Sequence, residues 1–192
     1  MVDVPLKCNC GEVAGTAIDV SARSGTRVIC HCDDCQAFAR YLEQQDDILD
    51  ENGGTDLFQI YPCQFKVTKG ADILRCLRLR PKGLLRWYTD CCKTPVANSI
   101  SAKIPFVGVF HGFMDDEGSR DQNLGPVRCR VQGKYALGDG SEADIHPKYP
   151  PGLSLRIARK MFIGKLSGKS RPNTLFDPAG RPISKPTIVS ST

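Results

Sequence analysis

The sequence predicts a mainly β protein, because most of its apolar residues lie in short alternating segments separated by turns. The chain has 192 residues, of which 18 are glycine and 13 are proline, and these residues punctuate the apolar segments. A hydrophobic content of 41% with 24% charged residues suffices for one well-packed core but not for two ordinary domains. We therefore expect one domain over residues 1–150, followed by a helix and tail over residues 151–192.

Alternating apolar residues mark the expected strands. They lie at residues 65–67, 74–79, 84–87, 106–110 and 127–131, and another strand is expected to end at Val28 and Ile29. The apolar residues of segment 33–50 predict one or two helical turns, which end at residues 52–54. The polar segment 114–126 is expected to form a mobile loop.

The region after residue 150 begins with a predicted amphipathic helix. Apolar residues recur with a helical period at Leu153, Ile157, Met161 and Leu166, and basic residues occupy much of the other face. From residue 152 onward, eight basic residues accompany one acidic residue, Asp177, whereas the preceding part is slightly acidic. Beyond the helix, four prolines and few large apolar residues predict a tail that wraps the surface or is disordered.

Ten cysteines are a high number for this chain, and they indicate either disulfides or metal binding. No basic segment followed by an apolar run opens the sequence, and no stretch reaches the roughly 18 apolar residues that span a bilayer. We therefore expect a cytoplasmic protein without a membrane partner, in which thiols remain reduced. The CxC and CxxC spacings also favour metal, because they aim two thiolates at one ion and are poorly placed for structural disulfides.

The strongest metal motif is the run of Cys30, Cys32 and Cys35 after the strand that ends at Ile29. A turn at this point can bring three thiolates to about 2.3 Å from one zinc ion. Three protein ligands leave a fourth position free, which is typical of catalytic or substrate-binding zinc, whereas structural zinc has four. The alternative is a structural site in which His31 or a distant cysteine supplies the fourth ligand.

Two further cysteine pairs predict a second zinc site. Cys8 and Cys10 form a CxC pair, and Cys91 and Cys92 are adjacent. Four thiolates from two distant loops would form a closed structural site that ties the N-terminus to the middle of the chain. Adjacent residues of an extended chain point to opposite faces, so both Cys91 and Cys92 bind only if the backbone bends sharply between them. Otherwise, one of the two is a bystander.

The remaining cysteines and histidines are expected to be structural. Cys63, Cys76 and Cys129 lie singly in apolar or strand-like segments, as buried small hydrophobic residues do. His111 is expected at the end of a strand and His146 in a loop. The sequence shows no Ser/His/Asp signature, no phosphate-binding glycine loop and no paired carboxylates in a catalytic context.

The order of these motifs resembles the glutathione-dependent formaldehyde-activating enzyme family, which includes centromere protein V. The resemblance extends over residues 5–110. It rests on Cys8, Cys10 and Gly11, on the CHCxxCQ run from Cys30 to Gln36, on the turn at Lys69 and Gly70, and on Trp87 or Tyr88 before Cys92, Thr94 and Pro95.

The resemblance implies a β-tent fold, in which twisted antiparallel sheets hold two zinc ions. Cys30, Cys32 and Cys35 would carry the catalytic zinc, and Cys8 and Cys10 with two later cysteines would carry the structural one. The sequence departs from the family's CxxCGTP motif, because Thr89 stands in place of its first cysteine and Lys93 in place of its glycine. Either Cys91 then substitutes as the fourth ligand or water completes the site.

The function that the resemblance implies is that of a zinc-dependent carbon-sulfur lyase similar to S-(hydroxymethyl)glutathione synthase. Its substrate would be an adduct of glutathione, or another small thiol, with formaldehyde or a related aldehyde. The alternative is a non-catalytic protein that zinc stabilises and that binds an anionic partner or another protein through its basic C-terminal segment. Nucleic acid is not the expected partner, because neither interleaved aromatic residues nor a DNA-reading module accompanies the basic helix. Self-association is left open.

Overall fold

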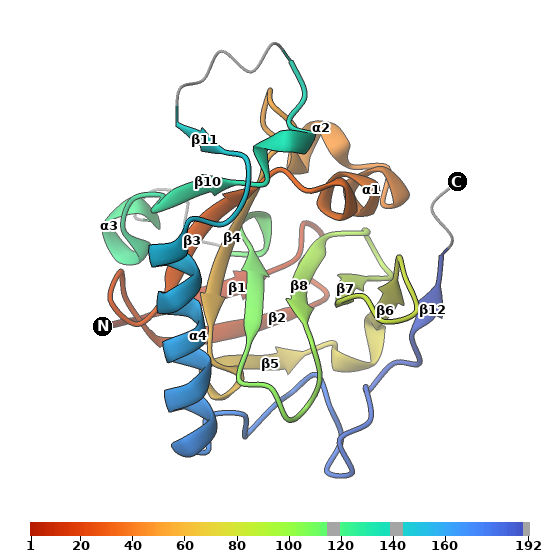
Figure 1. Cartoon of the computed structure of the whole chain (residues 1–192). Coiled ribbons are helices and arrows are strands. Elements are labelled where there is room, and N and C mark those ends of the chain that lie inside the picture. The colour runs from red at the N-terminus through yellow and green to blue at the C-terminus, as the bar shows by residue number, and fades with distance from the viewer. Residues whose placement is uncertain (115–119, 139–143, 190–192) are drawn as a thin grey trace.

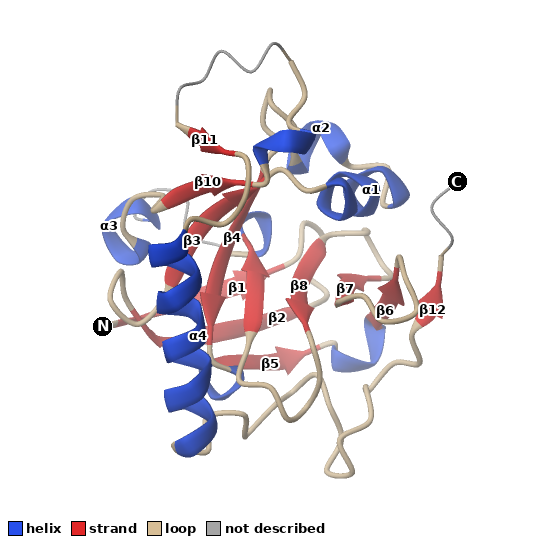
Figure 2. Cartoon of the chain, in the orientation of Figure 1, coloured by secondary structure: helices blue, strands red, loops and turns tan. Residues whose placement is uncertain are grey.

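The computed structural model describes residues 1–114, 120–138 and 144–189. The expectation of a mainly β protein is confirmed, since two sheets make up most of the regular structure and one long helix lies beside them (Figure 2). Most neighbouring strands are antiparallel, as expected, but three pairs toward the edges of the larger sheet are parallel.

The smaller sheet has three antiparallel strands. Their order is β1 (Val2–Lys7), β2 (Ala14–Val20) and β5 (Phe65–Lys69). Figure 1 shows this sheet behind the larger one, with its strands running across those of the larger sheet. β1 and β2 form a hairpin, and the connection between them carries the first cysteine pair, Cys8 and Cys10.

The larger sheet has nine strands. In order across the sheet they are β11 (Ile145–His146), β10 (Cys129–Val131), β3 (Thr26–Cys30), β4 (Thr55–Ile60), β9 (Val107–Phe110), β8 (Pro95–Ser99), β7 (Leu85–Thr89), β6 (Leu74–Arg78) and β12 (Thr187–Ile188). β10 is parallel to β3 and to β11, and β12 is parallel to β6. β10, β11 and β12 come from the later part of the chain, as expected because a parallel neighbour requires a long connection. All six strands predicted from the sequence are present, whereas β1, β2, β4, β8, β11 and β12 are additional.

Two hydrophobic cores lie on opposite faces of the larger sheet. The first core fills the space between the two sheets and includes Phe58 and Trp87. The second core lies under the helices and includes Leu57 and Phe110. Strands β7, β8 and β9 are buried at every position, because both faces of the sheet are covered. This double coverage places polar side chains such as Arg86 inside the protein.

Two short helices follow β3 directly. α1 (Asp33–Tyr41) and α2 (Gln45–Ile48) confirm the helical turns expected in this segment, although they end before residues 52–54. α3 (Arg120–Leu124) lies in the segment expected to be a loop, of which residues 115–119 lie outside the described residues. Four single turns of 3-10 helix also occur. They are η1 (Pro62–Gln64), η2 (Ala71–Ile73), η3 (His111–Phe113) and η4 (Gly133–Tyr135).

α4 (Pro151–Leu166) is the predicted C-terminal helix, and it runs along one side of the larger sheet (Figure 1). Leu153 is buried, and Ile157 packs against the second core. Leu166 was expected on the same face, but it is 73% exposed. A helix turns by about 100° per residue, so Leu166 lies on the side opposite to Leu153. The inner face is completed instead by the buried Gly164.

The tail wraps the surface, as one of the two sequence-based alternatives proposed, and also contributes to the first core. Leu175 and Phe176 are buried, and the Phe176 ring lies 6.0 Å from that of Trp87 between centroids. The tail then adds β12 to the edge of the larger sheet. Across the described residues, no helix combines the length and apolar character needed to cross a membrane.

Candidate metal centres

The structure brings the seven predicted ligands together in two groups. All ten cysteines are free thiols. Cys8, Cys10, Cys91 and Cys92 form one group, the four-thiol centre. Cys30, Cys32 and Cys35 form the other, the three-thiol centre. Within each group all Sγ atoms lie within 4.8 Å of one another, so each group could hold a metal ion.

The four-thiol centre joins the β1–β2 hairpin to the turn between β7 and β8. The Sγ of Cys91 lies 3.2 Å from that of Cys10 and 4.0 Å from that of Cys8. The backbone N–H of Val13 donates to the Cys8 Sγ at 3.2 Å. Such N–H donors favour the thiolate, which is the form that binds metal.

Cys91 and Cys92 both reach this centre because they lie in a tight turn over residues 90–92. Lys93 has a φ of 58°, in the left-handed region that favours glycine. Its N–H donates to the Thr89 carbonyl at 3.0 Å, which closes the turn. The Sγ atoms of Cys91 and Cys92 are 3.7 Å apart, and both belong to the group that could hold a metal ion.

The hydrogen bonds around Cys92 favour its thiolate form. Burial raises its pKa, but hydrogen bonds from the Thr89 and Thr94 hydroxyls and from backbone N–H groups lower it to about 5. The Thr94 hydroxyl lies 3.1 Å from the Cys92 Sγ, and it also accepts a hydrogen bond from the Asn9 N–H. These contacts hold the hairpin loop and the turn together without a metal ion.

The three-thiol centre is built on the junction between β3 and α1. Cys30 ends β3, Cys32 caps α1, and Cys35 lies in the first turn of that helix. The Cys35 N–H donates to the Cys32 carbonyl at 3.0 Å, so the two residues are held on one short turn. The N-terminal end of the helix also favours negative charge on these sulfurs.

His31 does not belong to the three-thiol centre. It is fully buried, and its Nδ1 lies 3.2 Å from the Val131 carbonyl oxygen of β10. Its Nε2 lies 3.9 Å from Asp50. Within the described part of the chain, the metal-ligating residues of this group are the three cysteines alone. The group thus offers one ligand fewer than a closed structural site requires.

A buried arginine compensates negative charge at the three-thiol centre. Arg86 of β7 donates to the Cys35 Sγ at 3.8 Å and lies 3.7 Å from the Asp34 carboxylate. Its side chain is only 2% exposed. Hydrogen bonds from the Cys30 and Cys32 thiols hold the pKa of Cys35 well below its usual value, and the Arg86 charge adds to this effect.

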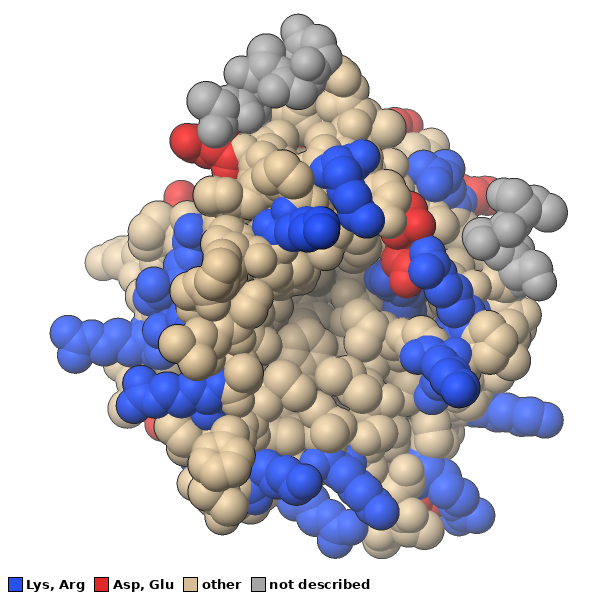
Figure 3. Space-filling model, viewed as in Figure 1, with Lys and Arg blue, Asp and Glu red and all other residues tan. Residues whose placement is uncertain are grey.

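One face of the protein is hollowed. Figure 3 shows a depression in the middle of this face, between the positions of α4 and α1 in Figure 1, with basic side chains around it. Tyr149 and Cys32 pack against the second core as partly buried residues. Burial raises the pKa of Tyr149, and the negative charges of the three cysteines raise it further, so its hydroxyl remains protonated beside the sulfurs.

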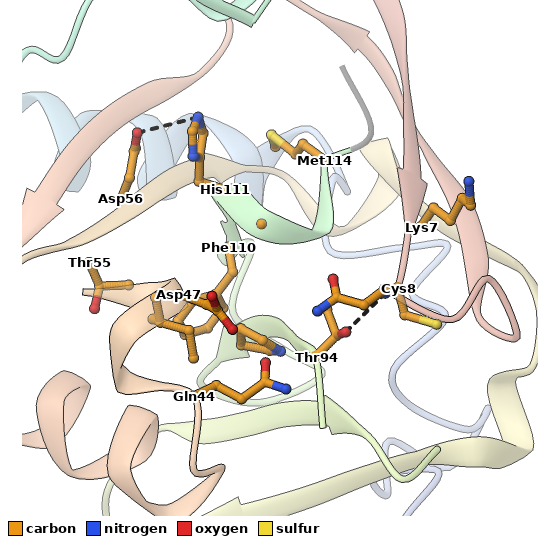
Figure 4. Close-up of a pocket in the computed structure, with 14 residues that line it drawn as sticks. Lys7, Cys8, Gln44, Asp47, Thr55, Asp56, Thr94, Phe110, His111 and Met114 are labelled. Carbon is orange, nitrogen blue, oxygen red and sulfur yellow. Dashed lines mark hydrogen bonds and ion pairs between the residues drawn. The ribbon is translucent and has the colours of Figure 1, made fainter. Parts of the chain in front are cut away.

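A separate hollow of about 670 Å³ borders the four-thiol centre at Cys8 (Figure 4). At its other end, the His111 Nε2 lies 3.7 Å from an Asp56 oxygen. Asp56 also accepts hydrogen bonds from Arg27, at 2.8 Å from Nη2. His111 directly follows β9, as expected, but the sequence did not single out its acidic partner.

The remaining cysteines and histidines match the sequence-based expectations only in part. Cys76 is buried, as predicted, whereas Cys63 and Cys129 are partly exposed. His146 lies in the short strand β11 rather than in a loop. Sequence patterns missed Arg86 and Tyr149, because only the folded chain brings β7 and the segment before α4 to the cysteines.

Together, the two sheets and the two cysteine groups define a β protein with two candidate metal centres. The chain belongs to the family described as a family of unknown function (DUF6151), whose model matches residues 1–186. No curated protein matches it. It is similar to a crystal structure of a Rhodobacter sphaeroides protein, at 15% identity and a TM-score of 0.42, over 62% of this chain and 94% of that one. Neither description names a ligand or a reaction.

Proposed function

We propose that both centres bind zinc and that the three-thiol centre also binds a small thiol. Four converging thiols in one group and three in the other are the observation that carries this proposal. Zinc accepts soft thiolate ligands in tetrahedral sites, which are closed when four protein ligands are present and open when three are. The four-thiol centre is then structural, and the three-thiol centre is functional.

When bound, zinc would supply positive charge that favours the thiolate form of a thiol in its fourth position. The residues of the chain prepare that position. Cys30, Cys32 and Cys35 hold the ion, and the buried Arg86 offsets the excess negative charge of several sulfurs. Arg86 also donates to the Asn98 side chain at 3.4 Å, which fixes the guanidinium on the face of the sheet.

We propose glutathione as the first thiol to test and its formaldehyde adduct as the substrate. In the direction of synthesis, the glutathione sulfur forms a bond to the carbonyl carbon of formaldehyde. The thiol proton passes to the carbonyl oxygen, so S-hydroxymethylglutathione contains every atom of both reactants. The lyase direction breaks the same carbon–sulfur bond. The resemblance to the formaldehyde-activating enzymes supports this choice of reaction.

Exchange NMR of a mixture of glutathione and formaldehyde tests the reaction. Zinc-loaded protein is expected to speed the exchange between free glutathione and the adduct, and Cys35→Ser is expected to abolish the effect. Cys63→Ser is the matched control, because Cys63 lies outside both centres. An unchanged exchange rate with zinc-loaded protein would contradict the enzyme and favour the alternative, a non-catalytic protein that zinc stabilises.

A further inference from the structure

A second hollow lies beside α4, far along the chain from the cysteine motifs. It has a volume of about 600 Å³. One face of α4 lines it over three turns, and the other walls come from the turn between β2 and β3, from Tyr61 and from Lys169, which follows α4. Its lining residues are Arg23, Ser24, Tyr61, Gly152, Leu155, Arg156, Arg159, Lys160, Ile163 and Lys169.

The charge of this hollow is entirely positive. Five of its lining residues are arginine or lysine, and none is acidic. In residues 1–114, 120–138 and 144–189, none of these five cations has a carboxylate partner. Figure 3 shows basic side chains gathered along the side of the molecule where α4 runs. The hollow therefore has a concentration of positive charge that the described protein does not neutralise.

Neutral groups hold two of these cations in place. Arg156 donates to the carbonyl oxygens of Arg23 and Gly25, each at 3.1 Å. The Lys160 ammonium donates to the Gln59 carbonyl at 2.7 Å. An ammonium group has three donors, so two remain for a ligand. Neutral partners fix the position of a charge without cancelling it.

The cations also repel one another. Burial and, to a smaller extent, the charges of Arg156 and Lys169 together lower the pKa of Lys160 to about 7. Lys160 and Lys169 both lie over the Tyr61 ring, at 5.0 Å and 5.2 Å from its centroid. An anion between these side chains would relieve their repulsion and replace the water lost by Lys160.

We propose that this hollow binds a multiply charged phosphate-type anion. Phosphate oxygens accept several charge-assisted hydrogen bonds at once, and guanidinium groups match their geometry. The volume exceeds that of one phosphate group, and the exposed Leu155 and Ile163 at the wall add apolar contact for an organic part. The ligand is therefore a phosphate ester or diphosphate, either free in solution or as a lipid headgroup. This site does not depend on the chemistry proposed for the three-thiol centre.

Calorimetric titration of pyrophosphate at low ionic strength tests the site in the zinc-loaded chain of 192 residues. Arg159→Gln is the main variant, because Arg159 is exposed and its loss leaves the packing of α4 intact. We expect it to weaken pyrophosphate binding at least tenfold. Lys165→Gln removes an exposed cation of the same helix outside the hollow and should bind like the wild type.

Vesicles of phosphatidic acid, whose headgroup is a multiply charged phosphate monoester, are compared with vesicles of phosphatidylcholine to separate the two sources of phosphate. Binding of pyrophosphate identifies a free ligand, and binding of the anionic vesicles alone identifies a lipid headgroup. In both cases Arg159→Gln must bind more weakly than Lys165→Gln. Equal binding by the two variants, or no binding of either probe by the wild type, would overturn the proposal.

Discussion

At the scale of single residues, Lys93 closes the turn that carries two thiols of the four-thiol centre. Its φ of 58° is uncommon for a residue with a side chain. An exposed ion pair with Asp90, at 2.8 Å, accompanies this turn and adds little stability. The backbone conformation is therefore the feature to test.

Lys93→Val should destabilise the turn, because a β-branched side chain disfavours the left-handed region. We expect the free energy of unfolding to fall by about 1–2 kcal/mol and zinc to dissociate faster from the four-thiol centre. Denaturant unfolding and zinc release to a coloured chelator measure both effects. Lys93→Gly is the matched control, since glycine accepts this φ, and it should retain zinc as the wild type does.

Arg86 is the second residue with a specific role, because it is a buried cation beside the three-thiol centre. Arg86→Met should lower the free energy of unfolding by about 3 kcal/mol, since it leaves buried negative charge without its partner. Chelator competition should show weaker zinc binding at the three-thiol centre and unchanged binding at the four-thiol centre. Arg86→Lys, which keeps the charge, should recover part of the affinity. Equal loss at both centres would indicate general destabilisation instead.

At the scale of elements, the fit of α4 against the protein depends on Gly164. A Cβ atom at this position would lie 2.4 Å from the Tyr61 ring and 3.1 Å from Pro105. The C-terminal half of α4 therefore has no room for a larger residue there. At Gly152, near the start of the same helix, a Cβ atom would meet nothing within 4 Å.

These two glycines give a matched test of the packing of α4. Gly164→Ala should lower the free energy of unfolding by about 1–3 kcal/mol, because the helix must shift away from Tyr61. Gly152→Ala should raise it by up to about 1 kcal/mol, since alanine favours a helix and has space here. Thermal unfolding of both variants measures the difference. Effects of the same sign would show that α4 is not held as described.

The sequence reveals those elements whose pattern is local. The run from Cys30 to Cys35 can be read directly, because one strand end and one helix turn place all three sulfurs. The four-thiol centre combines residues from two distant loops. The pair Cys8 and Cys10 and the pair Cys91 and Cys92 therefore predicted it only through their spacing and the family resemblance. Arg86 could not be assigned, since its partner Asp34 lies on α1 and meets β7 only across the second core. β8 was missed because both of its faces are buried, so its residues do not alternate.

At the scale of the whole molecule, the four-thiol centre fastens the smaller sheet to the larger one. Cys8 and Cys10 follow β1, and Cys91 and Cys92 follow β7. A zinc ion between them would connect segments 81 residues apart. Such a link restricts the unfolded chain and adds metal-binding energy to folding.

Removal of metal should therefore destabilise the whole protein. We expect chelation to lower the Tm by at least about 10 °C, because structural zinc contributes directly to folding. Cys8→Ser should produce a comparable drop before chelation and little further change after it. Cys32→Ser, in the three-thiol centre, should lower the Tm less. Calorimetric unfolding with and without chelator measures these shifts, and an unchanged Tm in the metal-free protein would contradict a structural role.

The difference between four and three thiols is the basis of the functional account, and binding of a thiol tests it most directly. The measurement is a calorimetric titration of glutathione into zinc-loaded wild type, Cys35→Ser and the Cys63→Ser control. We expect the wild type and Cys63→Ser to bind one glutathione per chain, and Cys35→Ser to give no binding heat. Equal heats from the wild type and Cys35→Ser would contradict an open three-thiol centre.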